Sequence, residues 1–213
     1  KDGDVLKETG LLGLSMEKVS PEKAKEGIKA GQSADFAQIA SIPSNLTIAE
    51  PSKLARMEIK IDGIINVSML SGGRQKMQKN ILTITKERIP PKPAETLPVS
   101  LQDYLKPSPL VQSEHGQIQA QVKKIIAPGD PPQEKIRKIV GWVYKNIEKK
   151  PVLSVPNAVE VLINKIGDCN EHAVLTAALL RAAGIPTQIE AGLVYLNGRF
   201  YYHAWNTAYL GDW

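Results

Sequence analysis

The 213-residue sequence has one cysteine, 5% aromatic residues and no long uninterrupted apolar segment. A single cysteine excludes an intramolecular disulfide and a cysteine-rich zinc site. The apolar run at residues 177–180 is broken by Arg181 and is far shorter than the ~20 residues that a membrane-spanning helix needs. The few aromatic residues are not interleaved with basic ones in the way that binds single-stranded nucleic acid. We therefore expect no transmembrane segment, no nucleic-acid partner and no metal site.

The formal net charge of +5 comes from lysines and arginines that are mostly spaced for one face of a helix. Residues 134–138, with the sequence EKIRK, show the pattern, which is typical of a solvated helix face. The sequence begins at Lys1 without a methionine or a secretory signal. We interpret it as a mature or trimmed chain from which targeting information is missing.

Prolines are concentrated at residues 89–109. Because proline lacks a backbone donor and fixes φ, this stretch is expected to form neither a regular helix nor a central strand. We interpret it as a linker or an extended crossing segment. It divides the chain into an N-terminal accessory module at residues 1–105 and a second domain at residues 106–213.

The N-terminal module contains signals for both helix and strand. Its helix is expected to start at Ser20 and to stop near Gly31. Strands are expected at residues 54–61 and 81–85, with a turn at residues 71–73 between them. This is the pattern of a small mixed, β-containing module, and nothing in it has catalytic spacing.

Beyond residue 109 the apolar periodicity becomes helical and then changes to that of strands. Helices are expected at residues 117–126, 131–147, 157–164 and 169–183. Strands are expected at residues 187–196 and 199–210, joined by an Asn197-Gly198 hairpin turn. The second domain is therefore expected to combine helices with an antiparallel sheet, in the α+β class.

Cys169 follows Gly167-Asp168 and falls in the first turn of its helix. Unpaired backbone N–H groups and the helix dipole stabilise a thiolate there, and the same N–H groups could bind an oxyanion. His203 lies on the second hairpin strand, where its imidazole could accept the thiol proton and later protonate a leaving amine. A structural interpretation is also open, because a lone cysteine is often a small buried hydrophobe and a strand histidine is often simply packed.

Two separated motifs carry a family resemblance. The segment GDCNEHA at residues 167–173, continuing through residues 178–186, resembles the nucleophile helix of the transglutaminase-like superfamily. The segment HAWN at residues 203–206 resembles that family's histidine strand. Residues 158–162 and 142–144 also fit, so the resemblance covers roughly residues 117–213, about half the chain.

The resemblance implies a papain-like α+β fold in which the nucleophile helix packs on an antiparallel sheet. It implies that Cys169 is the nucleophile and His203 the base of a catalytic triad. In the family an Asp on the following strand orients the imidazole, and we expect that residue to lie beyond Trp213. Asp212 is a less favoured stand-in for it.

Other residues near the two motifs are candidates for lining a cleft, namely Trp205, Tyr202, Asp168 and Trp142. Trp142 and Trp205 could instead be core aromatics. His172 is expected to have a structural role.

The resemblance implies a bacterial thiol enzyme that acts on amide bonds of a protein or peptide substrate without a cofactor. The leading hypothesis is a cysteine peptidase or amidase. A transglutaminase that forms Gln-Lys cross-links and a binding module with weak or no activity stay open as alternatives. An exported or cell-envelope location is expected, and the oligomeric state is left open.

Overall fold

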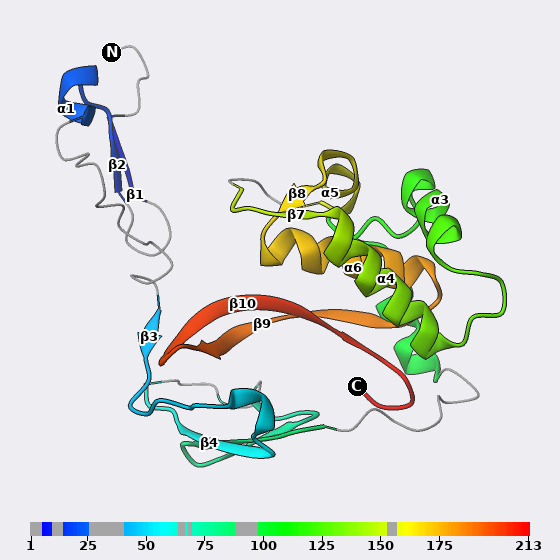
Figure 1. Ribbon diagram of the computed structural model, residues 1–213, viewed down its shortest axis with the longest axis horizontal. Helices are drawn as coiled ribbons and strands as arrows, with labels where there is room; N and C mark the ends of the chain where they lie inside the picture. The colour runs from blue at the N-terminus through cyan, green and yellow to red at the C-terminus, as the bar shows by residue number, and fades with distance from the viewer. Residues whose placement is uncertain are drawn as a thin grey trace. The chain divides into compact units, whose positions relative to one another are not determined.

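The computed structural model describes residues 6–9, 15–25, 41–63, 67, 70–87, 98–152 and 157–213. Its helices are α1 (Pro21–Lys25), α3 (Gly116–Ile125), α4 (Pro132–Asn146), α5 (Ala158–Asn164) and α6 (Cys169–Ala182), with short 3-10 helices η2 (Pro51–Lys53) and η4 (Val99–Leu105). Its strands are β1 (Lys7–Thr9), β2 (Ser15–Glu17), β3 (Ile42–Pro43), β4 (Arg56–Lys60), β5 (Gln75–Gln78), β6 (Ile81–Thr85), β7 (Glu148–Lys149), β8 (Ile166–Gly167), β9 (Thr187–Leu196) and β10 (Arg199–Ala208). Helices and mainly antiparallel sheets occur together, which confirms the predicted α+β class (Figure 1).

The chain divides into two compact units. The first comprises Lys1–Ile48 with Leu193–Tyr202, and the second comprises Ala49–Gly192 with His203–Trp213. In the described residues, no helix is both long and apolar enough to cross a membrane.

The first unit is built from short strands. β1 pairs antiparallel with β2, and α1 starts directly after Ser20, whose hydroxyl accepts a hydrogen bond from Lys23 N–H at 3.3 Å. The predicted stop of this helix at Gly31 lies outside the described residues. β3, which the sequence did not predict, pairs with β10 at Arg199 and Phe200.

A three-stranded antiparallel sheet with the order β4-β6-β5 belongs to the second unit. β6 matches its predicted bounds, and β4 lies within the strand predicted at residues 54–61. β5 was missed, because its sequence QKMQ offers a single apolar residue, Met77, and so no alternation. Pairing with Leu82 of β6 holds Met77 in the sheet despite that weak signal.

The helices of the second unit are arranged around α6, which contacts α3, α4 and α5 (Figure 1). Leu175, Leu179 and Leu180 of α6 are almost fully buried, and so are Ile118 of α3 and Ile139 of α4. A helix that is apolar on all sides must be enclosed by others, and the Ala- and Leu-rich sequence of α6 satisfies that condition. α6 is therefore the rigid centre on which any site at its end depends.

Each predicted helix of this unit is found within a residue or two of its expected bounds. Asn157 caps α5, its Oδ1 accepting a hydrogen bond from Glu160 N–H at 3.0 Å. Gly184, with φ of 80°, lets the chain turn away from the end of α6. The hairpin turn Asn197-Gly198 also has positive φ at both residues, 48° and 80°, as the sequence predicted.

Part of the proline-rich segment differs from the prediction. Val99–Leu105 forms the 3-10 helix η4, in which Leu101 is buried, and η4 contacts α6. Arg181 of α6 donates a hydrogen bond to the carbonyl of Lys106 at 2.8 Å. Burial of Leu101 thus favours an ordered turn over an extended crossing, while residues 88–97 lie outside the described range.

Candidate functional site

Cys169 is the first residue of α6, and Asp168 is the residue that caps this helix. Oδ1 of Asp168 accepts a hydrogen bond from Cys169 N–H at 2.7 Å. The Asp168 side chain also accepts from the backbone N–H of Glu171, and the Glu171 side chain accepts from Asp168 N–H at 2.9 Å. These reciprocal bonds form a capping box, which fixes the first turn around the half-buried Cys169.

The same turn explains the glycine before Asp168. Glu171 is only 4% exposed, and its side chain folds back over Gly167. A Cβ atom at Gly167 would lie 2.2 Å from Cβ of Glu171, far inside van der Waals contact. The Gly-Asp-Cys-x-Glu pattern therefore has a local structural basis, with glycine making room for the carboxylate that closes the capping box. The Asp-x-x-Glu spacing in the sequence is a signal that could have revealed it.

The N–H of Cys169 was expected to be available to an oxyanion. It is instead hydrogen bonded to the Asp168 carboxylate in the described conformation. That expectation is therefore wrong for this conformation, because a helix-capping side chain has satisfied the donor first.

His172 lies one turn into α6. Its Nδ1 is 2.7 Å from the carbonyl oxygen of Asp168, and because a carbonyl only accepts, Nδ1 carries the proton. Its Nε2 is buried and has no hydrogen-bond partner in the described part of the chain. These contacts agree with the structural role expected for His172.

β10 contacts α6 through Asn206. The Asn206 side-chain amide donates to the carbonyl of Ala173 on α6 at 3.0 Å and to that of Gln188 at 3.4 Å. Arg181 fixes the start of β9, donating from Nε and Nη2 to the carbonyl of Thr187 at 3.1 and 2.9 Å. Neither role was evident from the sequence, because each depends on which main-chain carbonyl the fold brings near.

His203 is exposed on β10, and its ring stacks on Trp205 with 6.3 Å between centroids. Trp205 in turn lies against Gly192 of β9, where an added Cβ would be 2.8 Å from the indole. Side chains alternate along a strand, so His203 and Trp205 share one face of β10 while Asn206 lies on the other. No hydrogen bond between the Cys169 thiol and the His203 imidazole is found among the described residues.

The remaining candidates have separate surroundings. Trp142 packs against the helical core, with the ammonium of Lys165 4.3 Å from its ring centroid, and burial lowers the pKa of that lysine. Tyr202 is 55% exposed. Asp212 is also exposed, and its carboxylate accepts a hydrogen bond from Trp213 N–H at 2.9 Å. Among the predicted site residues that the structure describes, Asp168 contacts Cys169 and His203 contacts Trp205, and no contact is found between these two pairs.

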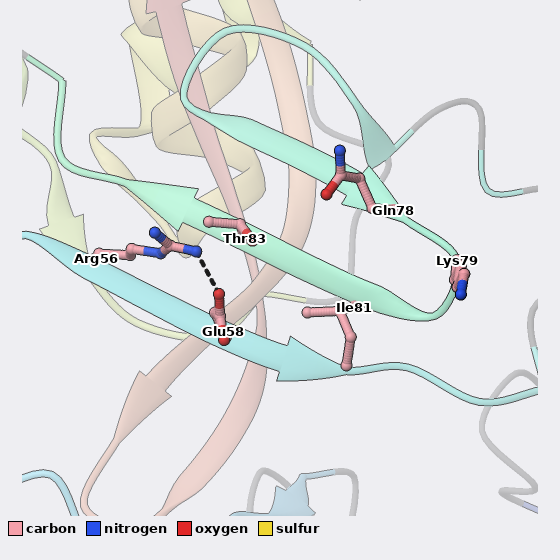
Figure 2. Close-up of a pocket in the computed structure, with 6 residues that line it drawn as sticks. All are labelled: Arg56, Glu58, Gln78, Lys79, Ile81 and Thr83. Carbon is pink, nitrogen blue, oxygen red and sulfur yellow. Dashed lines mark hydrogen bonds and ion pairs between the residues drawn. The ribbon is translucent and has the colours of Figure 1, made fainter.

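A shallow pocket of about 640 Å³ lies on the β4-β6-β5 sheet. Arg56 and Glu58 of β4, which form an ion pair, line it together with Gln78, Lys79, Ile81 and Thr83 (Figure 2). None of these is a predicted site residue. The pocket is thus a feature of the sheet and is distinct from the Cys169 turn.

A family model of the transglutaminase-like superfamily matches residues 119–213. Curated proteins give no match. Among solved structures, a candidate cysteine protease from Cytophaga hutchinsonii is 29% identical, with a TM-score of 0.49 over 54% of this chain and 40% of that one. The periplasmic domain of TgpA from Pseudomonas aeruginosa is 20% identical, with a TM-score of 0.44 over 56% of this chain and 46% of that one.

The chain spans less than half the length of either solved structure. Because both TM-scores are below 0.5, the assignment rests on the family match, which contains α6 with Cys169 and β10 with His203. Residues 119–213 belong to the transglutaminase-like superfamily.

Proposed function

We propose that the chain catalyses thiol-dependent acyl transfer at amide bonds, as a cysteine peptidase or amidase. The thiolate of Cys169 adds to the amide carbonyl carbon, and the tetrahedral intermediate collapses with cleavage of the C–N bond. The amine leaves with the proton that His203 has taken from the thiol. Water, deprotonated by His203, then hydrolyses the thioester to a carboxylic acid and restores the thiol.

The observation that carries the proposal is the position of Cys169 as the first residue of α6 within a matched transglutaminase-like domain. The first turn of a helix lies at the positive end of the helix dipole, which favours a thiolate. The thiol is half-buried, so a substrate can approach it from solvent. A cysteine that only filled the core would be placed with the buried residues of the later turns, such as Leu175 and Leu179.

The role of His203 is the more demanding part of the proposal. Its ring is on the face of β10 opposite to Asn206, the residue that contacts α6. Proton transfer requires an approach to about 3 Å, directly or through one water. The proposal therefore requires β10 or the His203 side chain to turn toward Cys169 when substrate binds, and catalytic contacts often tighten only in such a complex.

The alternatives differ in what happens after the acyl-enzyme. In a transglutaminase a lysine amine takes the place of water and forms a Gln-Lys cross-link. In a binding module no acyl-enzyme forms at all. Retention of a cysteine at the start of α6 together with a histidine on β10 favours an enzyme, because a module without chemistry needs neither.

The test measures the hydrolysis of amide and ester substrates, whose acyl groups Cys169 would accept as a thioester. It compares the wild-type chain with Cys169→Ala and His203→Gln. We expect Cys169→Ala to abolish activity and His203→Gln to reduce kcat on the order of 10³-fold. His115→Gln is the matched control, because His115 is an exposed cap of α3 with no proposed role in catalysis. Activity that survives in Cys169→Ala would contradict the proposal.

A second assay separates hydrolysis from cross-linking. A glutamine peptide is incubated with and without a lysine-like amine, and the products are resolved by mass. Cleavage or deamidation in both samples supports the hydrolase, whereas a conjugate that requires the amine supports the transglutaminase.

An exported or cell-envelope location stays part of the proposal and is tested by fractionation of cells that produce the full protein.

A further inference from the structure

We propose that Lys124 and Lys165, together with Trp142, form a binding site for an oxyanion, the phosphate or carboxylate group of a ligand. Lys124 lies in the last turn of α3, Trp142 in α4 and Lys165 at the end of α5, and all three belong to the second unit. α3 contacts both α4 and α5. The proposed acyl transfer assigns no role to these residues, so the inference goes beyond that function and stands without it.

The backbone of Lys165 is in a conformation that a lysine rarely adopts. It ends α5 with φ of 58° and ψ of 27°, in the left-handed region that favours glycine or asparagine. Non-glycine residues in this region are strained, and they cluster at active sites and ligand-binding sites. Because glycine would form the same helix end without strain, the helix end alone does not account for a lysine here.

The side chain of Lys165 is also held in place. Its ammonium group lies 4.3 Å from the ring centroid of Trp142, which is half-buried and packs against the helical core. Lys165 is itself half-buried. The negative face of an indole ring attracts a cation placed over it. The cation is therefore oriented before a ligand binds, which reduces the entropy lost on binding.

A second cation acts on the first. Burial and, to a smaller degree, repulsion from Lys124 lower the pKa of Lys165. In the part of the chain that the structure describes, neither ammonium group has a carboxylate partner. Each lysine lies at the C-terminal end of a helix, where the dipole offsets roughly half an elementary charge. Roughly one positive charge of the two thus remains unbalanced, and a bound oxyanion would neutralise it.

The chemistry of the two side chains indicates the ligand. An ammonium group has three hydrogen-bond donors and no acceptor, so it binds groups that accept hydrogen bonds and carry negative charge. Phosphate and carboxylate oxygens meet both conditions, and hydrogen bonds between ionised groups are stronger than those between neutral ones. Lys124 and Lys165 are therefore the binding residues, and Trp142 is a positioning residue that holds Lys165.

The experiment titrates the folded chain with sodium phosphate or sodium acetate, at an ionic strength held constant with sodium chloride. The signal followed is the indole N–H resonance of Trp142, which Trp142→Phe identifies. The titrations are repeated with Lys165→Met and Lys124→Met, because methionine keeps a flexible unbranched side chain without the charge. Lys123→Met is the matched control, since Lys123 is an exposed lysine in the same turn of α3 and is not part of the site.

We expect a saturable shift of the Trp142 resonance. Lys165→Met and Lys124→Met should each weaken the affinity on the order of tenfold, because a hydrogen bond between charged groups is lost. Lys123→Met should leave the affinity nearly unchanged. Tighter binding of phosphate assigns a phosphoryl ligand, and acetate binding at least as tight assigns a carboxylate. The absence of a saturable shift with either anion, or an equal loss in Lys123→Met, overturns the inference.

A second readout separates anion binding from a structural role of Lys165. A bound anion favours the charged ammonium group and should raise the pKa of Lys165, measured from its side-chain carbon resonances. A pKa that neither anion changes overturns the inference. Lys165→Gly, in which the strain at φ of 58° is relieved, replaces Lys165→Met if the latter does not fold.

The two proposals fail in different ways. A chain that binds phosphate or acetate at this site but has no turnover contradicts the proposed function alone. A chain with turnover whose Trp142 resonance does not respond to either anion contradicts only the inference.

Discussion

The two parts of the proposed site, the start of α6 with Cys169 and the strand β10 with His203, differ in how many contacts hold their side chains. At the start of α6, Asp168, Cys169 and Glu171 are joined by reciprocal hydrogen bonds within five consecutive residues that also include Gly167. On β10, His203 is exposed and touches Trp205 of its own strand. The proposed nucleophile at the helix start is thus placed by local sequence, whereas the position of the proposed base depends on tertiary contacts of its strand.

The largest expected effect is a loss of activity without a loss of stability when Cys169 or His203 is replaced. Cys169→Ser should remove thiol chemistry, and His203→Gln should lower kcat on the order of 10³-fold. Because His203 is exposed, its replacement should leave the unfolding temperature essentially unchanged. Steady-state kinetics and thermal unfolding of the same samples give the answer. A strongly destabilised His203→Gln would show that the histidine is a packing residue.

A smaller effect is expected at the glycine that makes room for Glu171. Gly167→Ala should lower the free energy of unfolding by roughly 1–3 kcal/mol, because the new Cβ overlaps the Glu171 side chain. Gly141→Ala is the control, since Gly141 lies within α4 and an added Cβ there meets nothing within 4 Å. That variant should gain roughly 0.5–1 kcal/mol. Denaturant unfolding measures both, and a Gly167→Ala chain as stable as the wild type would contradict the account of this turn.

A further prediction tests the link between the two ends. Asn206→Ala removes the hydrogen bond from β10 to the Ala173 carbonyl and should cost roughly 0.5–1.5 kcal/mol in unfolding free energy. Its effect on kcat should be larger than this small loss implies, because β10 carries His203. Thr207→Ala, which removes only a 3.4 Å contact with Glu190, serves as the comparison. Equal kinetics in the two variants would show that Asn206 does not position the strand.

The smallest expected effect is on the pH dependence of stability at Asp130, between α3 and α4. Hydrogen bonds from Lys138 and from Ala127 N–H hold the pKa of Asp130 below its ordinary value. A lowered carboxyl pKa stabilises the fold above the ordinary Asp pKa, and this stabilisation is lost as the pH falls through the lowered value. Asp130→Asn should therefore lower the unfolding temperature slightly at neutral pH, with the difference disappearing in acid. A difference that persists in acid would exclude this ionic origin.

The sequence predicted most of the second unit because its signals are local. Asn157 as a cap, Gly184 after α6 and Asn197-Gly198 between β9 and β10 each specify their backbone without help from distant residues. β3 was missed because it is defined by pairing with β10, which is remote in sequence. β5 was missed because its own sequence, QKMQ, has no apolar alternation, and pairing with β6 defines it. The proposed site shows the same difference between local signals and long-range contacts. Cys169 at a helix start was predictable, whereas the Asn206 contact and the facing of His203 depend on how β10 meets α6.

The reactivity of Cys169 is the most direct test of the central claim, that the start of α6 activates this thiol for attack. The rate of alkylation by iodoacetamide is measured across a pH series, and the modified residue is identified by peptide mapping. Cys169 in the folded protein is expected to be alkylated faster than a free cysteine at the same pH. A rate that follows the profile of a free cysteine, or a thiol that does not react in the folded protein, would contradict it.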